Sequence, residues 1–288
     1  MKIIDIIKLK KSVLSFEFFP PKKVENEHIL FETIEELKNF KPDFVSITYG
    51  AGGSTKDKTL NWTIKLQNDY KIETMMHLTC ITSQKTEIEY ILNQLYNNNV
   101  QNILALRGDI PKDNNDYKIS KDFHYAADLV KVIKRDGRFC IGVAGYPEGH
   151  LEAESLEKDI EYLKRKLDEG GEFIITQLFF DNRYFYNYRD LLEKNSIDVP
   201  ILAGIMPVTS LQQIDRFKQM CGVDIPKMLI EKLKDKNDED IFKIGIEHTI
   251  NQCHDLIKNG VKGLHFYTLN KSDATKIILQ SLGDYRNG

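Results

Sequence analysis

The chain has 288 residues, 41% of them hydrophobic and 29% charged, which is the composition of a soluble globular protein with one large or two small domains. Its net charge is −3, from 40 basic and 43 acidic residues, and no strongly basic block supports binding to nucleic acid. No apolar run approaches the roughly 20 residues of a membrane span. An acid, Asp5, interrupts the apolar N-terminal stretch, so we expect no signal peptide and a cytoplasmic location.

The cysteines lie far apart in the sequence and form no C-x-x-C pair; they are Cys80, Cys140, Cys221 and Cys253. We therefore expect buried, reduced thiols. A metal site at Cys253 and His254 is the alternative, but no second ligand pair accompanies it. The chain also lacks an H-E-x-x-H motif and an acidic cluster suited to Mg²⁺, so no metal is expected.

Short β-rich runs alternate with longer helical patterns along the whole chain. Strands are predicted at 13–19, 44–49, 73–79, 102–107, 139–145, 173–179, 200–206 and 263–267. Helices are predicted at 28–40, 56–69, 84–97, 122–135, 153–169, 182–194, 210–220, 226–257 and 272–282. Alternation of this kind without a long linker predicts one domain over 1–288, a (β/α)8 TIM barrel. An open doubly wound sheet is the alternative, but no G-x-G-x-x-G follows the first strand.

The first predicted strand carries an acid among aromatic residues. Glu17 lies in the run Phe16-Glu17-Phe18-Phe19, and Pro20-Pro21 ends the strand. Alternation places Leu14, Phe16 and Phe18 on one face and Glu17 on the other. A carboxylate in such a strand is costly to bury unless it is paired or has a chemical task.

Polar and aromatic residues collect where the predicted strands end, the edge at which barrels of this kind carry their chemistry. Each has a structural explanation as well, such as helix capping, loop packing or pairing of Arg107 with Asp109 across the rim.

On the helix at 153–169, Asp159, Tyr162 and Lys166 share one stripe, which indicates either a surface salt-bridge face or a polar arm that reaches a ligand. The chain lacks the G-x-S-x-G elbow of a hydrolase and a late-strand lysine for a Schiff base. The polar and aromatic residues at the predicted strand ends suit a large planar cofactor with a phosphate.

Seven motifs, in order, are similar to those of the methylenetetrahydrofolate reductase family. They are Ser15-Phe16-Glu17-Phe18-Phe19-Pro20-Pro21-Lys22, Ser46-Ile47-Thr48-Tyr49-Gly50-Ala51, His77-Leu78-Thr79-Cys80, Ala105-Leu106-Arg107-Gly108-Asp109, Tyr146-Pro147-Glu148, Thr176-Gln177-Leu178-Phe179-Phe180-Asp181 and His265-Phe266-Tyr267-Thr268-Leu269-Asn270. One such motif is weak, but the ordered set covers nearly the whole chain. The chain resembles the short bacterial form, without the regulatory domain of the eukaryotic enzymes.

The resemblance implies a TIM barrel with non-covalent FAD that reduces 5,10-methylenetetrahydrofolate to 5-methyltetrahydrofolate, with NAD(P)H as donor in a ping-pong sequence. It implies Glu17 as the general acid that promotes iminium formation, with Asp109 as a second catalytic carboxylate. The positions that match flavin contacts are Thr48, Tyr49, Ala51, His77, Arg107, Gly108, Asp109, Tyr125, Ala126, Tyr146, His150, Ala153, Asp159, Arg165 and Lys166. Those near folate or nicotinamide are Gln177, Gln213, Phe217 and Lys271.

Two positions depart from the family pattern. Lys271 stands where the resemblance leads us to expect arginine, and lysine lacks the bidentate fork of arginine. Tyr162 replaces a smaller polar residue. A homo-oligomer is implied by the bacterial relatives, and an electron-donor partner subunit is a further option. The alternative functions are a flavin- or folate-binding subunit of a larger methyl-transfer complex and a cofactor-free barrel lyase or aldolase that uses Glu17.

Overall fold

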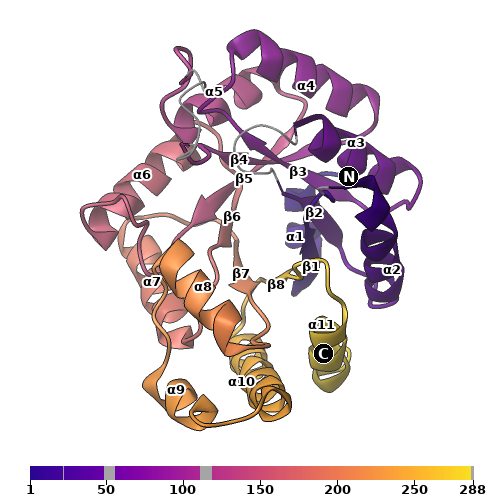
Figure 1. Ribbon diagram of the computed structural model, residues 1–288. Helices are drawn as coiled ribbons and strands as arrows, with labels where there is room; N and C mark the ends of the chain where they lie inside the picture. The colour runs from indigo at the N-terminus through magenta and orange to yellow at the C-terminus, as the bar shows by residue number, and fades with distance from the viewer. Residues whose placement is uncertain (22, 49–55, 111–118, 287–288) are drawn as a thin grey trace.

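The computed structural model describes residues 1–21, 23–48, 56–110 and 119–286. Parallel strands pair in chain order, and β1 (Val13–Phe18) pairs with both β2 (Phe44–Ile47) and β8 (Gly263–Tyr267). The sheet therefore closes into an eight-stranded barrel, seen in Figure 1 as a ring of strands with helices around it. The predicted (β/α)8 fold is confirmed, and the open-sheet alternative is wrong.

The remaining strands and helices alternate, except that three helices follow β7. The other strands are β3 (Thr74–Thr79), β4 (Asn102–Leu106), β5 (Cys140–Gly145), β6 (Phe173–Thr176) and β7 (Ile201–Ile205). The outer helices are α2 (Glu27–Lys38), α3 (Lys56–Asn68), α4 (Lys85–Asn97), α5 (Ala126–Asp136), α6 (Leu156–Asp168), α7 (Asn182–Lys194), α8 (Leu211–Cys221), α9 (Lys227–Leu233), α10 (Asp238–Lys258) and α11 (Asp273–Leu282). Side-chain caps fix where several of them begin: Ser155, Asp181 and Ser210 each accept a backbone N–H of the first turn.

The N-terminal end of the barrel is closed by α1 (Ile3–Leu9), a helix that the sequence did not predict. It lies behind the strands in Figure 1. The buried isoleucines of α1 pack against an interior layer that includes Val13, Phe44, Met75, Leu104 and Phe173. The Ile3 N–H also donates to Asn102 Oδ1 at 2.8 Å. Because this end is filled, the opposite end, where the strands terminate, is the mouth.

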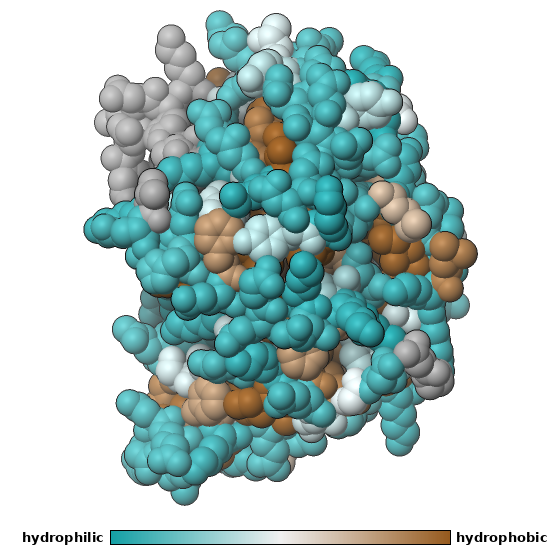
Figure 2. Space-filling view, turned by 90° about the vertical axis from the view of Figure 1, so that its right-hand side faces the viewer, coloured by the Kyte–Doolittle hydropathy of each residue, from teal (hydrophilic) through white to brown (hydrophobic). Residues whose placement is uncertain are grey.

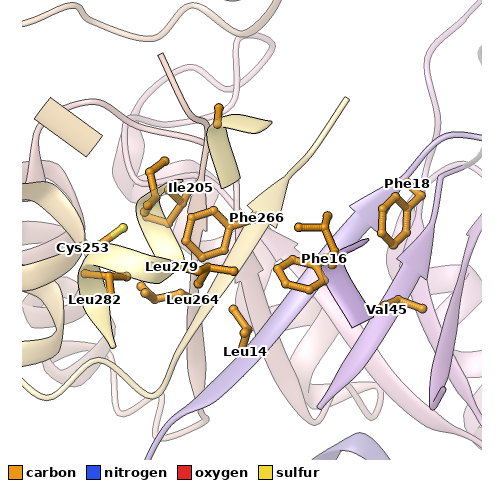
Figure 3. Close-up of a cluster of buried hydrophobic side chains, with 14 of the residues drawn as sticks. Leu14, Phe16, Phe18, Val45, Ile205, Cys253, Leu264, Phe266, Leu279 and Leu282 are labelled. Carbon is orange, nitrogen blue, oxygen red and sulfur yellow. The ribbon is translucent and has the colours of Figure 1, made fainter. Parts of the chain in front are cut away.

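The strand alternation predicted for β1 is confirmed. Leu14, Phe16 and Phe18 belong to the outer core, between the barrel wall and its helices, and Figure 3 shows Phe16 beside Phe266 of β8. The two rings lie 6.3 Å apart between centroids. Glu17 therefore faces into the barrel, away from the phenylalanines on either side of it in the sequence.

Three predicted boundaries are wrong. β6 ends at Thr176 and not at 179, so Gln177 follows the strand. The helix predicted at 226–257 is two helices, because Asn237 caps a new one by accepting the Asp240 N–H at 2.9 Å. α5 begins at Ala126, four residues later than predicted.

A second, smaller core lies over the ends of β6 and β7. It is built largely from the segment after β7, and its buried members are Leu178, Phe180, Met206, Val208, Ile214, Val223, Ile225, Leu229, Leu233 and Ile241. Phe217 of α8 and Tyr267 of β8 pack against it at its edge. This core therefore carries α8 and α9 to one side of the mouth.

The outer helices are amphipathic, as their position requires. α2 buries Leu30, Ile34 and Leu37 against the sheet and directs charged residues to solvent. Figure 2 shows the side of the molecule that lies at the right of Figure 1, and small hydrophobic patches are scattered there among hydrophilic residues. None of the described helices is both long and apolar enough to cross a membrane.

Candidate active site

Glu17 lies between two histidines inside the mouth. Its Oε2 is 3.5 Å from His77 Nε2 and 3.4 Å from His265 Nε2, and all three side chains are buried. They come from β1, β3 and β8, and barrel closure makes β8 a direct neighbour of β1, with His265 in register with Ser15. The structure thus places a carboxylate between two imidazoles, a group that can hold and transfer a proton.

The chemical state of His77 follows from its burial. The pKa of His77 is lowered to about 4, because the effect of burial outweighs the opposing carboxylate of Glu17 and His265 adds a smaller lowering. His77 is therefore neutral at neutral pH. The carboxylate oxygen of Glu17 faces an uncharged ring there.

Ser15 orients His265 toward Glu17. Ser15 Oγ and His265 Nδ1 are hydrogen-bonded at 2.8 Å, and Phe44 stacks on the imidazole with ring centroids 6.1 Å apart. When the serine hydroxyl donates to Nδ1, the Nε2–H of the ring points at the carboxylate of Glu17. The three residues then form a chain of hydrogen-bonding groups on the inner face of β1 and β8.

Tyr267 forms the wall beside this group because Gly204 leaves room for it. A Cβ on Gly204 would lie 2.8 Å from the Tyr267 ring and 2.2 Å from Thr176 O. The Tyr267 hydroxyl donates to that same carbonyl at 2.7 Å. The ring of Tyr267 also meets His265 edge-on at 5.4 Å. Gly204 is therefore required for the shape of the mouth.

Three buried polar atoms inside the mouth have no hydrogen-bond partner within the described ranges: Ser46 Oγ, Thr48 Oγ1 and His77 Nε2. They project from the inner faces of β2 and β3 and from the residue that follows β2. Buried groups of this kind are normally satisfied in native proteins. The set fits a ligand with several polar atoms along a flat edge, such as the flavin that the resemblance implies.

Four of the predicted cofactor residues, Tyr146, His150, Asp159 and Lys166, gather on the neighbouring side of the mouth. Lys166 Nζ donates to Ala144 O at 2.6 Å and lies 5.8 Å from the centre of the Tyr146 ring, which meets His150 edge-on at 4.7 Å. Burial lowers the pKa of Lys166 to about 8, while Asp159 opposes this shift. Burial likewise raises the pKa of Asp159, against the pull of Lys166. α6 therefore directs Asp159 and Lys166 inward, whereas Tyr162, the third member of the predicted stripe, is exposed.

Arg107 pairs with a residue that the sequence did not single out. Its Nη1 donates to Glu152 Oε2 at 2.5 Å, and this hydrogen bond raises the pKa of Arg107. The expected pairing of Arg107 with Asp109 is not the contact seen. Gly108 adopts a φ of +84°, with its Cα against Thr79, and Asp109 follows as an exposed residue at the rim.

Three predicted residues lie on the outside. Arg165 is exposed and stacks on the Tyr162 ring at 5.5 Å, so these two residues point away from Lys166. Tyr125 is 64% exposed at the start of α5, beside Ala126. Lys271 is exposed in the loop after β8.

The predicted substrate residues lie near the second core. Gln177 follows β6, and its Oε1 accepts the Leu178 N–H at 2.9 Å. Gln213 Oε1 accepts from Thr209 N at 2.8 Å, which anchors the first turn of α8 to the loop before it. Phe217 is half-buried one turn further along α8. Ala153 lies in the loop before α6, while Tyr49 and Ala51 fall outside the described residues.

No specific role was predicted for His265, although it lies in one of the family-like motifs. Its contact with Glu17 depends on the closing pair of β1 with β8, which sequence spacing cannot reveal. Glu152 was likewise missed, because an exposed loop acid carries no pattern. Within the described ranges no three potential ligands form a group that could hold a metal ion.

Comparison with known proteins assigns the chain to a family. The family model for methylenetetrahydrofolate reductase matches residues 2–283. The 5,10-methylenetetrahydrofolate reductase of Buchnera aphidicola is 38% identical over 288 residues, covering 97% of this chain and 97% of the relative. The enzyme of the same name from Escherichia coli is 38% identical over 272 residues, with 94% and 90% covered.

Eukaryotic relatives are longer. Methylenetetrahydrofolate reductase 1 of Schizosaccharomyces pombe is 38% identical over 279 residues, which cover 95% of this chain but 46% of the relative. The chain thus spans about half the length of this relative. A Clostridium thermocellum protein that binds two copies of 5-methyl-5,6,7,8-tetrahydrofolic acid shares the fold, with a TM-score of 0.68, 15% identity and 99% of each chain covered. On the family match and the bacterial relatives, the chain belongs to the methylenetetrahydrofolate reductase family.

Proposed function

We propose that this protein is an FAD-dependent enzyme that reduces 5,10-methylenetetrahydrofolate to 5-methyltetrahydrofolate with electrons from NAD(P)H. The observation that carries the proposal is the carboxylate of Glu17, buried between two histidines at the mouth of a barrel whose family match spans nearly the whole chain. The bacterial relatives that the chain covers almost completely bear the name of this reductase. That name argues against a cofactor-free lyase.

The cofactor would bind along the side of the mouth between β2 and α6. FAD, when bound, supplies a two-electron carrier between the donor and the folate. Arg107 and Lys166 bring positive charge for its diphosphate, and the unpartnered hydroxyl of Thr48 and ring nitrogen of His77 offer hydrogen bonds. The other residues proposed to line this site are Gly108, Asp109, Ala126, Tyr146, His150, Ala153 and Asp159. The exposed Tyr125 and Arg165 would contact the cofactor only at the outer edge of the site, and contacts from Tyr49 and Ala51, which lie outside the described residues, stay predictions from the resemblance.

Glu17 would act as the general acid. The methylene bridge of the substrate opens when a proton reaches N10, which leaves a 5-iminium cation ready for reduction. His265 holds one carboxylate oxygen of Glu17 from the side, and Ser15 fixes the orientation of that imidazole. This hydrogen-bonded chain would hold the carboxyl group of Glu17 in a fixed orientation for proton donation to N10.

The remaining site residues would bind the two substrates in turn. Asp109, at the exposed rim, is proposed to stabilise the iminium cation by its negative charge. Gln177 and Gln213 supply amides, Phe217 supplies a face for a flat ring, and Lys271 attracts the acidic tail of a folate. One mouth with an aromatic face and few fixed charges suits a ping-pong order, in which NAD(P)H leaves before the folate enters. We also propose a homo-oligomeric cytoplasmic enzyme that serves one-carbon metabolism and methionine synthesis.

The deciding experiment is anaerobic stopped-flow spectroscopy of the purified protein. We expect flavin absorbance, bleaching by NADH or NADPH, and recovery of the oxidised spectrum when methylenetetrahydrofolate is added. A folded protein with no flavin absorbance and no affinity for added FAD would refute the proposal. Bleaching only by a co-purified protein would replace NAD(P)H as the donor with a partner subunit.

A further inference from the structure

Glu148 connects two segments that border the mouth from different parts of the chain. Its Oε2 accepts the backbone N–H of Asp224 at 2.7 Å, across 76 positions of sequence. Next to this bond, Leu151 packs on Gly222, where a Cβ would lie 2.2 Å from Leu151 Cδ2. Gly222 also has a φ of +69°, a backbone conformation that favours glycine over residues with a side chain. We call the two contacts together the Glu148 clasp.

The clasp joins the two sides of the proposed site. The loop that carries Glu148 also carries Tyr146 and His150, which are proposed to contact the cofactor. Asp224 follows the C-terminus of α8, the helix that carries Gln213 and Phe217. The effect on folate binding that we infer below rests on the proposed function. The contact between Glu148 and Asp224 is observed independently of it.

α8 depends on its ends for its position. Of its residues only Ile214 is buried, so the helix has little apolar anchorage of its own. Ser210 caps its first turn by accepting the Gln213 N–H at 3.1 Å. At the other end, Gly222 ends the helix and the Glu148 clasp follows directly. Val223 and Ile225, on either side of Asp224, are buried in the second core, so loss of the clasp would loosen the C-terminal end of α8 from the cofactor-side loop without detaching it from that core.

The surroundings of Glu148 are acidic. Asp224 and Asp181 face it, although Tyr184 donates to Asp224 Oδ2 at 3.1 Å and Arg183 pairs with Asp181. Its second oxygen, Oε1, is buried and has no hydrogen-bond partner within the described ranges. Burial, followed by repulsion from the two aspartates, raises the pKa of Glu148 to about 7, against the stabilising Asp224 N–H.

The sign of the pH effect follows from that shift. In the clasped state the carboxyl group holds its proton more tightly than it would in water, where its ordinary pKa is 4.5. The clasp is therefore strongest at low pH, weakens as pH rises from 4.5 to about 7, and changes little above that.

We propose that Glu148 is a positioning residue that fixes α8 against the cofactor-side loop, so that Gln213 and Phe217 are correctly placed for the folate. It touches neither substrate nor cofactor in this role. The role predicts an effect on KM for the folate, with the rate of flavin reduction at saturating donor retained.

Two variants separate this role from simple structural damage. Glu148→Ala removes the acceptor, and we expect KM for methylenetetrahydrofolate to rise about tenfold, as for a lost buried hydrogen bond. Glu148→Gln keeps a carbonyl for the Asp224 N–H and carries no charge, so it should restore the low KM. In the wild type KM should rise between about pH 5 and 7 and level off above that, and in Glu148→Gln this rise should disappear. Glu154→Ala, an exposed acid in the same loop, is the control and should behave as wild type.

Hydrogen exchange tests the clasp without relying on activity. Amides of 211–224 should exchange faster in Glu148→Ala than in wild type, and Glu148→Gln should match wild type at pH 6. Equal exchange in all three proteins, or a Glu148→Gln that resembles the alanine variant, would overturn the inference. If wild type bound no flavin, the proposed function would fail, while the exchange data would still decide whether Glu148 holds α8.

Discussion

Glu17 shows how far a single residue can be interpreted from its strand. Alternation along β1 correctly placed it opposite Phe16 and Phe18, on the inner face at the mouth. Alternation could not predict which side chains from other strands contact Glu17. His77 and His265 lie 60 and 248 positions away and meet it only because the barrel closes.

Glu17→Gln should separate the two half-reactions. Glutamine keeps the shape of the side chain and its contact with His265 but cannot donate a carboxyl proton. We expect folate reduction to fall by about 10²–10⁴, while flavin reduction by the donor stays near the wild-type rate. Single-turnover stopped flow measures both. Glu239→Gln, an exposed acid paired with Lys243 on α10, is the matched control. Equal loss of both half-reactions would show that Glu17 serves binding and not proton transfer.

Lys166 should make cofactor affinity depend on pH. Its pKa is lowered to about 8 by burial, so the unliganded protein loses this positive charge as pH rises through that value. We expect FAD to bind more weakly at pH 9 than at pH 7, measured by quenching of flavin fluorescence. Lys166→Met should bind weakly at both values. Lys164→Met, which removes an exposed lysine that pairs with Asp168, should keep the wild-type difference. A pH dependence unchanged in Lys166→Met would assign it to another group.

The secondary-structure elements were predictable where their signals are long and periodic. The eight strands and most of the helices match, but α1 was missed because seven residues with four isoleucines read as a short apolar stretch. The break between α9 and α10 was missed although Asn237 is a good cap, since the helical pattern resumes at once after it. The predicted β6 was extended to 179 because Leu178 and Phe179 are apolar. Neither residue pairs with β7: Leu178 packs in the second core and Phe179 packs in the outer core.

α1 should contribute stability and leave the chemistry intact. Ile7 is fully buried against the interior layer at the closed end of the barrel, far from the mouth. Ile7→Ala should lower the free energy of unfolding by about 2–5 kcal/mol, through lost transfer energy and the cavity left behind. Leu9→Ala, on the same helix but 79% exposed, should change it by less than about 0.5 kcal/mol. Urea unfolding and kcat, measured on both variants, test this. A reduced kcat in folded Ile7→Ala would mean that the closed end influences the mouth.

At the scale of the whole molecule, the closed sheet unites the chain. β1 and β8 come from opposite ends of the sequence and pair over five residue positions, from Val13 with Gly263 to Glu17 with Tyr267. The same pairing carries Glu17 and His265, so their contact and the closure of the barrel depend on one pair of strands. Partial folding of either half would therefore leave the contact between Glu17 and His265 unformed.

This arrangement predicts a single domain that unfolds in one step. The chain has one tryptophan, Trp62 on α3, which packs with Phe31 at 4.9 Å in the largest outer core and so reports on the first third of the barrel. Far-UV circular dichroism reports on all helices. We expect the two thermal transitions to coincide.

FAD at 100 times its Kd should shift both transitions upward together, by the equivalent of about 2.7 kcal/mol, because its proposed site lies where strands from both halves of the barrel meet. Riboflavin, which lacks the diphosphate that Arg107 and Lys166 are proposed to bind, should shift them less at the same concentration. Separate transitions, or a shift confined to one probe, would divide residues 1–288 into independent folding units.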